Sequence, residues 1–241
     1  MESLAKHAAD HFDQESITDQ SPDLSIVTLS SSGSITRSLA EVVKSATGKG
    51  RNVKITALES RPGFEGVAFV NNLLASLKSN SKTKEHLKIE LVSDASMATA
   101  LKGADFLVFG GDKVLPNGDV SNKIGTLAAA VLSTHLHAKC QVVALFSTNK
   151  IISSGFDEDH LVVEYNDPAE LTRAWPSRFI YELKEARDQG YNVEVKNAYF
   201  EWVPAKFINT YISDVGELKL KDIERLGKES EELEKRIFGG L

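Results

Sequence analysis

The residue types best suited to chemistry gather in one glycine-rich stretch near the middle of the sequence. It begins with Gly110-Gly111-Asp112 and continues through residues 117–126, with two acids, an amide and a lysine among its members. Asp112 follows an apolar run, so we expect it near the floor of a pocket, where desolvation raises the pKa of a carboxyl and lets it carry protons. The glycines allow a ligand to approach the backbone closely. On spacing alone, the alternative for Asp112 is a structural role, and the alternative for the segment around Asn117 is a plain turn.

Three further polar segments follow predicted strands. They cover residues 30–34, 59–63 and 94–96. The first leads into a predicted helix whose free N–H groups attract anions, so Gly33 and Ser34 are expected to contact the ligand. Arg61 can clamp a phosphate or carboxylate, and Asp94 is a further candidate for ligand binding. The simpler alternatives are N-caps for the serines and for Asp94, and a surface turn for Arg61.

Five apolar runs provide the strands that would position these segments. They cover residues 25–29, 53–58, 87–92, 106–109 and 141–146. A stretch with helical spacing follows each of the first four, including an alanine-rich one over 123–138. This alternation predicts an α/β fold, with a doubly wound, mostly parallel Rossmann-like sheet and helices on both faces. Ligands bind at the carboxyl edge of such sheets, where all four polar segments fall.

The remaining segments are less regular. Residues 153–175 contain one possible strand over 161–165, and 179–187 is helical in pattern. We therefore divide the chain into an N-terminal extension (1–24), an α/β domain (25–216) and a C-terminal amphipathic helix (217–241). The apolar stripe of that helix is formed by Leu220, Ile223, Leu226, Leu233 and Ile237. Such a stripe packs on the domain or docks a partner subunit.

Charge and composition narrow the classes of function. The chain has 28 basic and 34 acidic residues, a net charge of −6, which argues against direct DNA binding or broad attachment to anionic membranes. Its apolar runs are far shorter than the ~20 residues that span a bilayer. The single cysteine, Cys140, excludes an internal disulfide, and the histidines lack metal-ligand spacing. We expect a cytoplasmic protein without metal or organic cofactor.

Five ordered segments carry a family resemblance. They are Glu59-Ser60-Arg61-Pro62 with Gly66, Val92-Ser93-Asp94-Ala95, the stretch 110–126, the stretch 197–204, and Ile212-Ser213-Asp214-Val215-Gly216. Together they resemble the family that unites the alpha, beta and delta subunits of eukaryotic translation initiation factor 2B with methylthioribose-1-phosphate isomerase and ribose-1,5-bisphosphate isomerase. The resemblance implies a Rossmann-like fold. In its isomerase branch it implies conversion of a sugar phosphate from aldose to ketose.

Carried over by position, the resemblance assigns roles to individual residues. Asp112 takes the place of the acid that moves protons, and Asn122 and Lys123 take the places of a pair that contacts substrate. The isomerases have a cysteine where this sequence has Ser30, and a serine hydroxyl is a much poorer proton shuttle. Only residues 1–24 precede the first strand, where the family usually has a helical domain with an Arg-Gly-Ala phosphate loop. The sequence therefore resembles a member that lacks this domain.

The serine at position 30 and the missing helical domain decide which function we expect. We expect a non-catalytic protein similar to the subunits of initiation factor 2B, with a pocket for a phosphorylated sugar or nucleotide, that acts through contacts in a homo- or hetero-oligomer. The alternative is an isomerase of a phosphorylated pentose, with Asp112 as main acid and base and Ser30 as a weak helper. An unrelated reaction in the same pocket is a third possibility.

Overall fold

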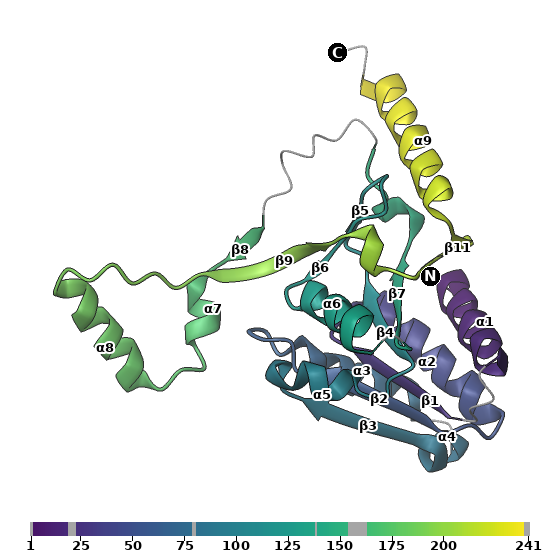
Figure 1. The fold of residues 1–241 in the computed structure, drawn as a ribbon, viewed down its shortest axis with the longest axis horizontal. Helices are drawn as coiled ribbons and strands as arrows, with labels where there is room; N and C mark the ends of the chain where they lie inside the picture. The colour runs from purple at the N-terminus through teal and green to yellow at the C-terminus, as the bar shows by residue number, and fades with distance from the viewer. Residues whose placement is uncertain (1, 19–22, 79–80, 138, 154–162, 239–241) are drawn as a thin grey trace.

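The computed structural model describes residues 2–18, 23–78, 81–137, 139–153 and 163–238. Seven strands form the central sheet: β1 (Leu24–Thr28), β2 (Val53–Leu58), β3 (Leu87–Val92), β4 (Phe106–Gly110), β7 (Gln141–Phe146), β10 (Thr210–Ser213) and β11 (Gly216–Leu218). Their order is β11-β10-β7-β4-β1-β2-β3, and every pair is parallel except β10 with β11 (Figure 1). The five predicted strands and the parallel sheet are confirmed.

Helices cover both faces of this sheet, as predicted. They are α1 (Glu2–Thr18), α2 (Gly33–Gly48), α3 (Glu65–Leu77), α4 (Ser81–His86), α5 (Met97–Leu101), α6 (Thr126–Leu136) and α9 (Leu220–Phe238). One apolar core joins the sheet to α1, α2 and α3, and a second joins its other face to α5, α6 and α9. Burial on both faces explains why the central strands read as continuous apolar runs.

The N-terminal residues belong to the fold, in contrast to the predicted extension. Leu4, Ala8 and Phe12 of α1 are fully buried against the sheet, and the ring of Phe12 meets that of Phe106 edge to face at 4.7 Å. The sequence signal was weak because alanines provide much of the buried face of α1.

A second, antiparallel sheet was missed in the sequence. Its strands are β5 (Lys113–Val114), β6 (Val120–Lys123), β9 (Asn197–Val203) and β8 (Glu164–Asn166), in the order β5-β6-β9-β8. The helix predicted over 123–138 is therefore shorter, because Lys123 ends β6 and α6 begins only at Thr126. Gly125, with φ of 98°, allows the sharp change of direction between them.

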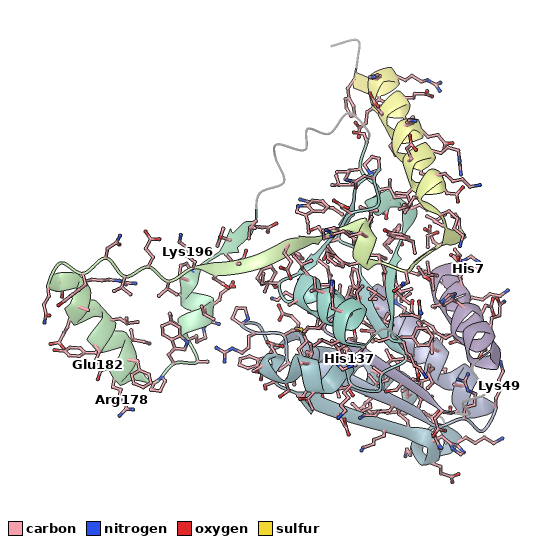
Figure 2. The ribbon with its side chains drawn as sticks, in the orientation of Figure 1. His7, Lys49, His137, Arg178, Glu182 and Lys196 are labelled. Carbon is pink, nitrogen blue, oxygen red and sulfur yellow. The ribbon has the colours of Figure 1, made fainter. Side chains whose placement is uncertain are left out.

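The strands β8 and β9 continue into an arm that projects from the central sheet (Figure 1). It carries α7 (Pro168–Thr172) and α8 (Ser177–Asp188), and α8 confirms the helix predicted there. Arg178 and Glu182 point outward from α8 (Figure 2), and that helix has no buried residue. The possible strand over 161–165 overlaps β8 only at 164–165, and residues 161–162 lie outside the described part.

The C-terminal helix α9 is present, but only its first half packs on the domain. Ile223 and Gly227 are buried, whereas Leu233 and Ile237 are 54% and 60% exposed. Residues 217–218 belong to β11 rather than to this helix. Among the described residues, no helix combines the length and apolar character that crossing a membrane requires.

Candidate functional site

A polar cavity of about 280 Å³ opens at the carboxyl ends of β1, β4 and β7. The loop before α2, the segment after β4, the end of β6 and two residues of β9, Tyr199 and Phe200, meet there. Its polar lining side chains are Ser30, Ser31, Ser32, Ser34, Glu65, Asp112, Asn122, Lys123, Ser147, Lys150 and Tyr199. Of the eight residues predicted for the site, the structure brings five into this lining: Asp112, Ser30, Ser34, Asn122 and Lys123.

Asp112 lies two residues after the end of β4 and lines the cavity. Its backbone N–H donates to the carbonyl oxygen of Ser121 at 2.9 Å, which ties the residue to β6. Burial raises the pKa of its carboxyl above the ordinary value, and Glu164 adds to this increase while Lys150 opposes it. The carboxyl therefore keeps its proton to a higher pH than a solvated aspartate, as an acid that donates protons requires.

Ser30 is buried and connects three segments of the chain. Its Oγ accepts hydrogen bonds from the N–H of Gly110 at 2.9 Å and from Nδ2 of Asn122 at 3.0 Å. Nδ2 of Asn122 also donates to Oγ1 of Thr126 at 2.9 Å. Ser30 therefore holds the ends of β1, β4 and β6 together, which is a structural task that needs no proton transfer.

Replacement of Ser30 by alanine is expected to lower the free energy of unfolding by about 1–3 kcal/mol. The variant leaves the buried N–H groups of Gly110 and Asn122 without their acceptor, and unsatisfied donors are costly inside a protein. Urea denaturation would measure the loss. Ser31→Ala, in the same loop, should change stability by less than about 0.5 kcal/mol. Equal effects of the two variants would contradict this account of Ser30.

Three of the lining side chains, Glu65, Lys123 and Tyr199, form a hydrogen-bonded cluster that contains an ion pair. Oε1 of Glu65 accepts hydrogen bonds from Nζ of Lys123 at 2.6 Å and from the hydroxyl of Tyr199 at 2.7 Å. The Lys123 ammonium also lies 3.5 Å from the centre of the Tyr199 ring. Burial and the neighbouring carboxylate raise the pKa of Tyr199 to about 12, so this hydroxyl remains a hydrogen-bond donor.

Glu65, Tyr199 and Lys150 were not predicted as site residues. Oε2 of Glu65 is buried and has no hydrogen-bond partner among the described residues, so this carboxylate can still accept a bond from a ligand. Tyr199 lies in a segment that the family resemblance marked without assigning it a role. Glu65 opens α3, where an acid is ordinary. No local sequence signal pairs it with a tyrosine 134 positions away.

The structure does not bring Gly33, Arg61 or Asp94 into the cavity lining. The two carboxylate oxygens of Asp94 accept the N–H groups of Ser60 at 2.9 Å and of Arg61 at 2.8 Å, so Asp94 supports the loop after β2. The Arg61 guanidinium lies 5.0 Å from the Phe64 ring and donates to the carbonyl of Leu171. Asp94 and Arg61 thus have structural contacts outside the cavity, and the ligand contacts expected for these three residues stay predictions.

The two nearby helix N-termini differ in what they offer an anion. At α6, the carboxylate of Glu201 already accepts the N–H groups of Gly125 at 2.6 Å and Leu127 at 3.0 Å. At α2, the N-cap Ser32 accepts only the N–H of Ile35, and Ser34 of the first turn lines the cavity. A ligand anion therefore has its better position at α2. In the described part of the chain, no three His, Cys, Asp or Glu side chains are grouped to hold a metal ion.

A mostly parallel, Rossmann-like sheet with a cavity of mixed charge at its carboxyl edge places the chain in the class of Rossmann-like α/β proteins. The family is shown by comparison with known sequences. The model of the Initiation factor 2 subunit family matches residues 2–220, so the chain belongs to this family.

Curated relatives in this family are named methylthioribose-1-phosphate isomerase. The protein from Desulforudis audaxviator is 33% identical over 180 residues, 74% of this chain and 46% of the relative. The protein from Pelotomaculum thermopropionicum is 31% identical over 199 residues, 81% of this chain and 49% of the relative. The chain thus spans about half the length of these relatives.

Solved structures share the fold at low sequence identity. The 5-methylthioribose 1-phosphate isomerase from Pyrococcus horikoshii superposes with a TM-score of 0.68 at 20% identity, over 96% of this chain and 58% of the other. The translation initiation factor eIF-2B from the same organism gives 0.63 at 21% identity, over 90% and 63%. A subunit of the tetrameric eIF2B-beta2-delta2 complex from C. thermophilum gives 0.61 at 14% identity, over 95% and 59%.

Proposed function

We propose that this chain acts on a phosphorylated pentose as an aldose–ketose isomerase of the methylthioribose-1-phosphate type. The observation that carries the proposal is Asp112, a partly desolvated acid with a raised pKa, in one cavity with Asn122 and Lys123. The curated relatives support catalysis over the non-catalytic role expected from the sequence. Because the chain spans about half of them, the activity of the whole isomerase is part of the proposal.

Asp112 is assigned the two proton transfers of this reaction. A cyclic pentose 1-phosphate needs a proton on its ring oxygen as the ring opens, and the hydroxyl on C2 loses a proton as the ketone forms. As the bond between C1 and the ring oxygen breaks, the hydrogen on C2 moves to C1 with its electron pair. The proton gained by the ring oxygen is balanced by the one lost from the C2 hydroxyl. A carboxyl with a raised pKa holds the first proton and can accept the second.

The other lining groups are assigned to binding. Lys150 and the first turn of α2, with Ser34, offer positive potential and N–H donors to the phosphate. Asn122 and Lys123 are assigned to the sugar, because the family resemblance gives this pair contact with substrate. Lys123 forms an ion pair with Glu65. The sugar therefore meets a pair with no net charge rather than a free ammonium group.

A non-catalytic role similar to the subunits of initiation factor 2B is the second candidate, and Ser30 favours it. The isomerases of the resemblance have a cysteine there, whereas the Ser30 hydroxyl holds two N–H donors of its own chain. In this role the same cavity senses a sugar phosphate or nucleotide, and the protein acts through subunit contacts. Turnover of a pentose phosphate separates the two candidates.

Binding is tested by thermal unfolding with methylthioribose 1-phosphate, ribose 1,5-bisphosphate and AMP. A ligand at a hundred times its Kd is expected to add about 2.7 kcal/mol of stability. For a chain of this size, that corresponds to an increase in Tm of roughly 5–10 °C.

Lys123→Met, which keeps the bulk of the buried side chain, should lose this increase. Lys113→Met is the matched control, because Lys113 is exposed and outside the cavity lining. No shift with any ligand, or an equal shift in Lys123→Met, would contradict the assignment.

A further inference from the structure

The outer edge of β3 ends the central sheet and carries no neighbouring strand among the described residues. β3 pairs in parallel with β2 along its whole length, from Leu87 opposite Val53 to Val92 opposite Leu58. Figure 1 shows β3 along the lower rim of the molecule, with its outer side uncovered. Such an edge presents a row of backbone N–H and C=O groups that can pair with another strand.

The two faces of β3 differ in chemistry. Lys88 and Glu90 project from one face, where Nζ of Lys88 and Nζ of Lys54 on β2 each lie 2.8 Å from the Glu90 carboxylate. Leu87, Ile89 and Leu91 project from the other face, since side chains alternate along a strand.

The apolar face of β3 continues onto the neighbouring helices. Leu87 and Ile89 line a shallow groove of about 470 Å³ together with Leu74 and Leu77 of α3. The remaining lining residues are Lys78 at the end of α3 and Thr83 and Lys84 of α4. Leu74 is 45% exposed and Leu91 is 46% exposed. The strand edge and this groove form one surface, which we call the β3 surface.

The sequence of β3 is complementary to itself when read in the opposite direction. In an antiparallel pair centred on Ile89, Lys88 lies opposite Glu90 of the second strand and Leu87 lies opposite Leu91. Directly opposite pairs of unlike charge and of apolar side chains both stabilise a sheet. We propose that the β3 surface binds a second copy of this chain, with the two β3 strands antiparallel about a two-fold axis at Ile89.

Other arrangements of the same two strands lose this match. A parallel pair in register places Lys88 opposite Lys88 and Glu90 opposite Glu90, and like charges in direct opposition destabilise a sheet. A slip of one residue in the antiparallel pair sets the apolar face of one strand beside the charged face of the other. The antiparallel pair about Ile89 also closes on itself, so it gives a dimer contact rather than an open fibre.

Two charge reversals test the proposal, with the 241-residue chain and sedimentation equilibrium as the readout. Lys88→Glu makes both charged positions of β3 acidic, and Glu90→Lys makes both basic, so each variant alone opposes like charges across the pair. Each variant should weaken this self-association step at least about tenfold, because two attractive contacts per dimer become repulsive. Circular dichroism confirms that each variant is folded.

The decisive sample is an equimolar mixture of the two variants. In a mixed pair, the acid introduced at position 88 of one chain meets the base introduced at position 90 of the other. The second contact joins the native Glu90 of the first chain to the native Lys88 of the second, so association should return to the wild-type strength. The double variant Lys88→Glu/Glu90→Lys should likewise associate as the wild type does. The proposal is overturned if the wild-type chain shows no self-association that the single reversals weaken, or if the mixture associates no better than its components.

Discussion

Asparagine in place of Asp112 is expected to reduce isomerase turnover by a factor of about 10² to 10⁴, the usual contribution of a positioned acid or base. The amide keeps the size of the side chain but neither gives nor takes the protons that ring opening and ketone formation require. KM should change little, because the assigned contacts with sugar and phosphate belong to other residues. Steady-state kinetics on the pentose phosphate, with kcat and KM resolved, measures both quantities.

The matched control is Asp119→Asn, in the same glycine-rich stretch. The Asp119 carboxylate accepts the N–H of Ala205 at 2.8 Å and does not line the cavity. This variant makes the same replacement of a carboxyl by an amide as Asp112→Asn and should keep the wild-type kcat. If both variants lost turnover equally, or if Asp112→Asn kept the full rate, the assignment of Asp112 would be wrong.

Asp112→Asn is also expected to change the free energy of unfolding, and the pKa of Asp112 determines the sign of this change. Burial raises the pKa of Asp112, so the native state binds this proton more tightly than the unfolded state does. The contribution of Asp112 to stability is therefore present below the unfolded pKa and is lost as the pH rises through the folded pKa. Asp112→Asn should be more stable than the wild type at neutral pH, and this gain should shrink in acid. Urea denaturation at several pH values tests the sign.

Alanine in place of Gly66 is expected to lower the free energy of unfolding by more than about 3 kcal/mol, above the usual cost of overpacking because the obstacle is backbone. A Cβ at this position would lie 1.8 Å from the carbonyl oxygen of Leu58. The end of β2 and the start of α3 would have to separate, and this movement would displace Glu65 from Lys123. Thermal unfolding should show a decrease in Tm of roughly 10 °C.

Gly48→Ala serves as the control for this prediction. Gly48 is the last residue of α2, and a Cβ there meets nothing within 4 Å. Alanine has the higher helix propensity, so this variant should be as stable as the wild type or slightly more stable. Equal destabilisation by the two substitutions would show that the close approach at Leu58 does not limit the fold.

Local sequence pattern predicted the central sheet because β1, β2, β4 and β7 are buried on both faces and the edge strand β3 still keeps its apolar residues in alternation. The strand β6 could not be found in this way, since Val120, Ser121, Asn122 and Lys123 show no apolar run, although all four are buried in the structure. Its burial depends on pairing with β9, a strand more than seventy positions further along the chain. Pairing of this kind follows from tertiary structure rather than from local pattern.

The residues of the candidate site also fall into those that the sequence could predict and those that it could not. Asp112, Ser30 and Ser34 were predictable because each follows a buried strand or opens the next helix at the carboxyl edge of the sheet. Asp94 has the same local pattern, but its carboxylate binds the backbone of the neighbouring loop. The sequence cannot distinguish an aspartate that lines the cavity from one that is bound to a loop. The N–H groups that bind Asp94 belong to a segment more than thirty positions away. Glu65 joins the site only through contacts with distant Lys123 and Tyr199.

Proton NMR of the chain incubated with methylthioribose 1-phosphate tests the central claim most directly. The account predicts that the anomeric proton signal of the aldose phosphate disappears while two C1 protons of the ketose phosphate appear, and that Asp112→Asn slows this change by the factor given above. An unchanged spectrum, from protein that the same sugar phosphate stabilises against unfolding, would contradict the isomerase assignment and leave the non-catalytic role.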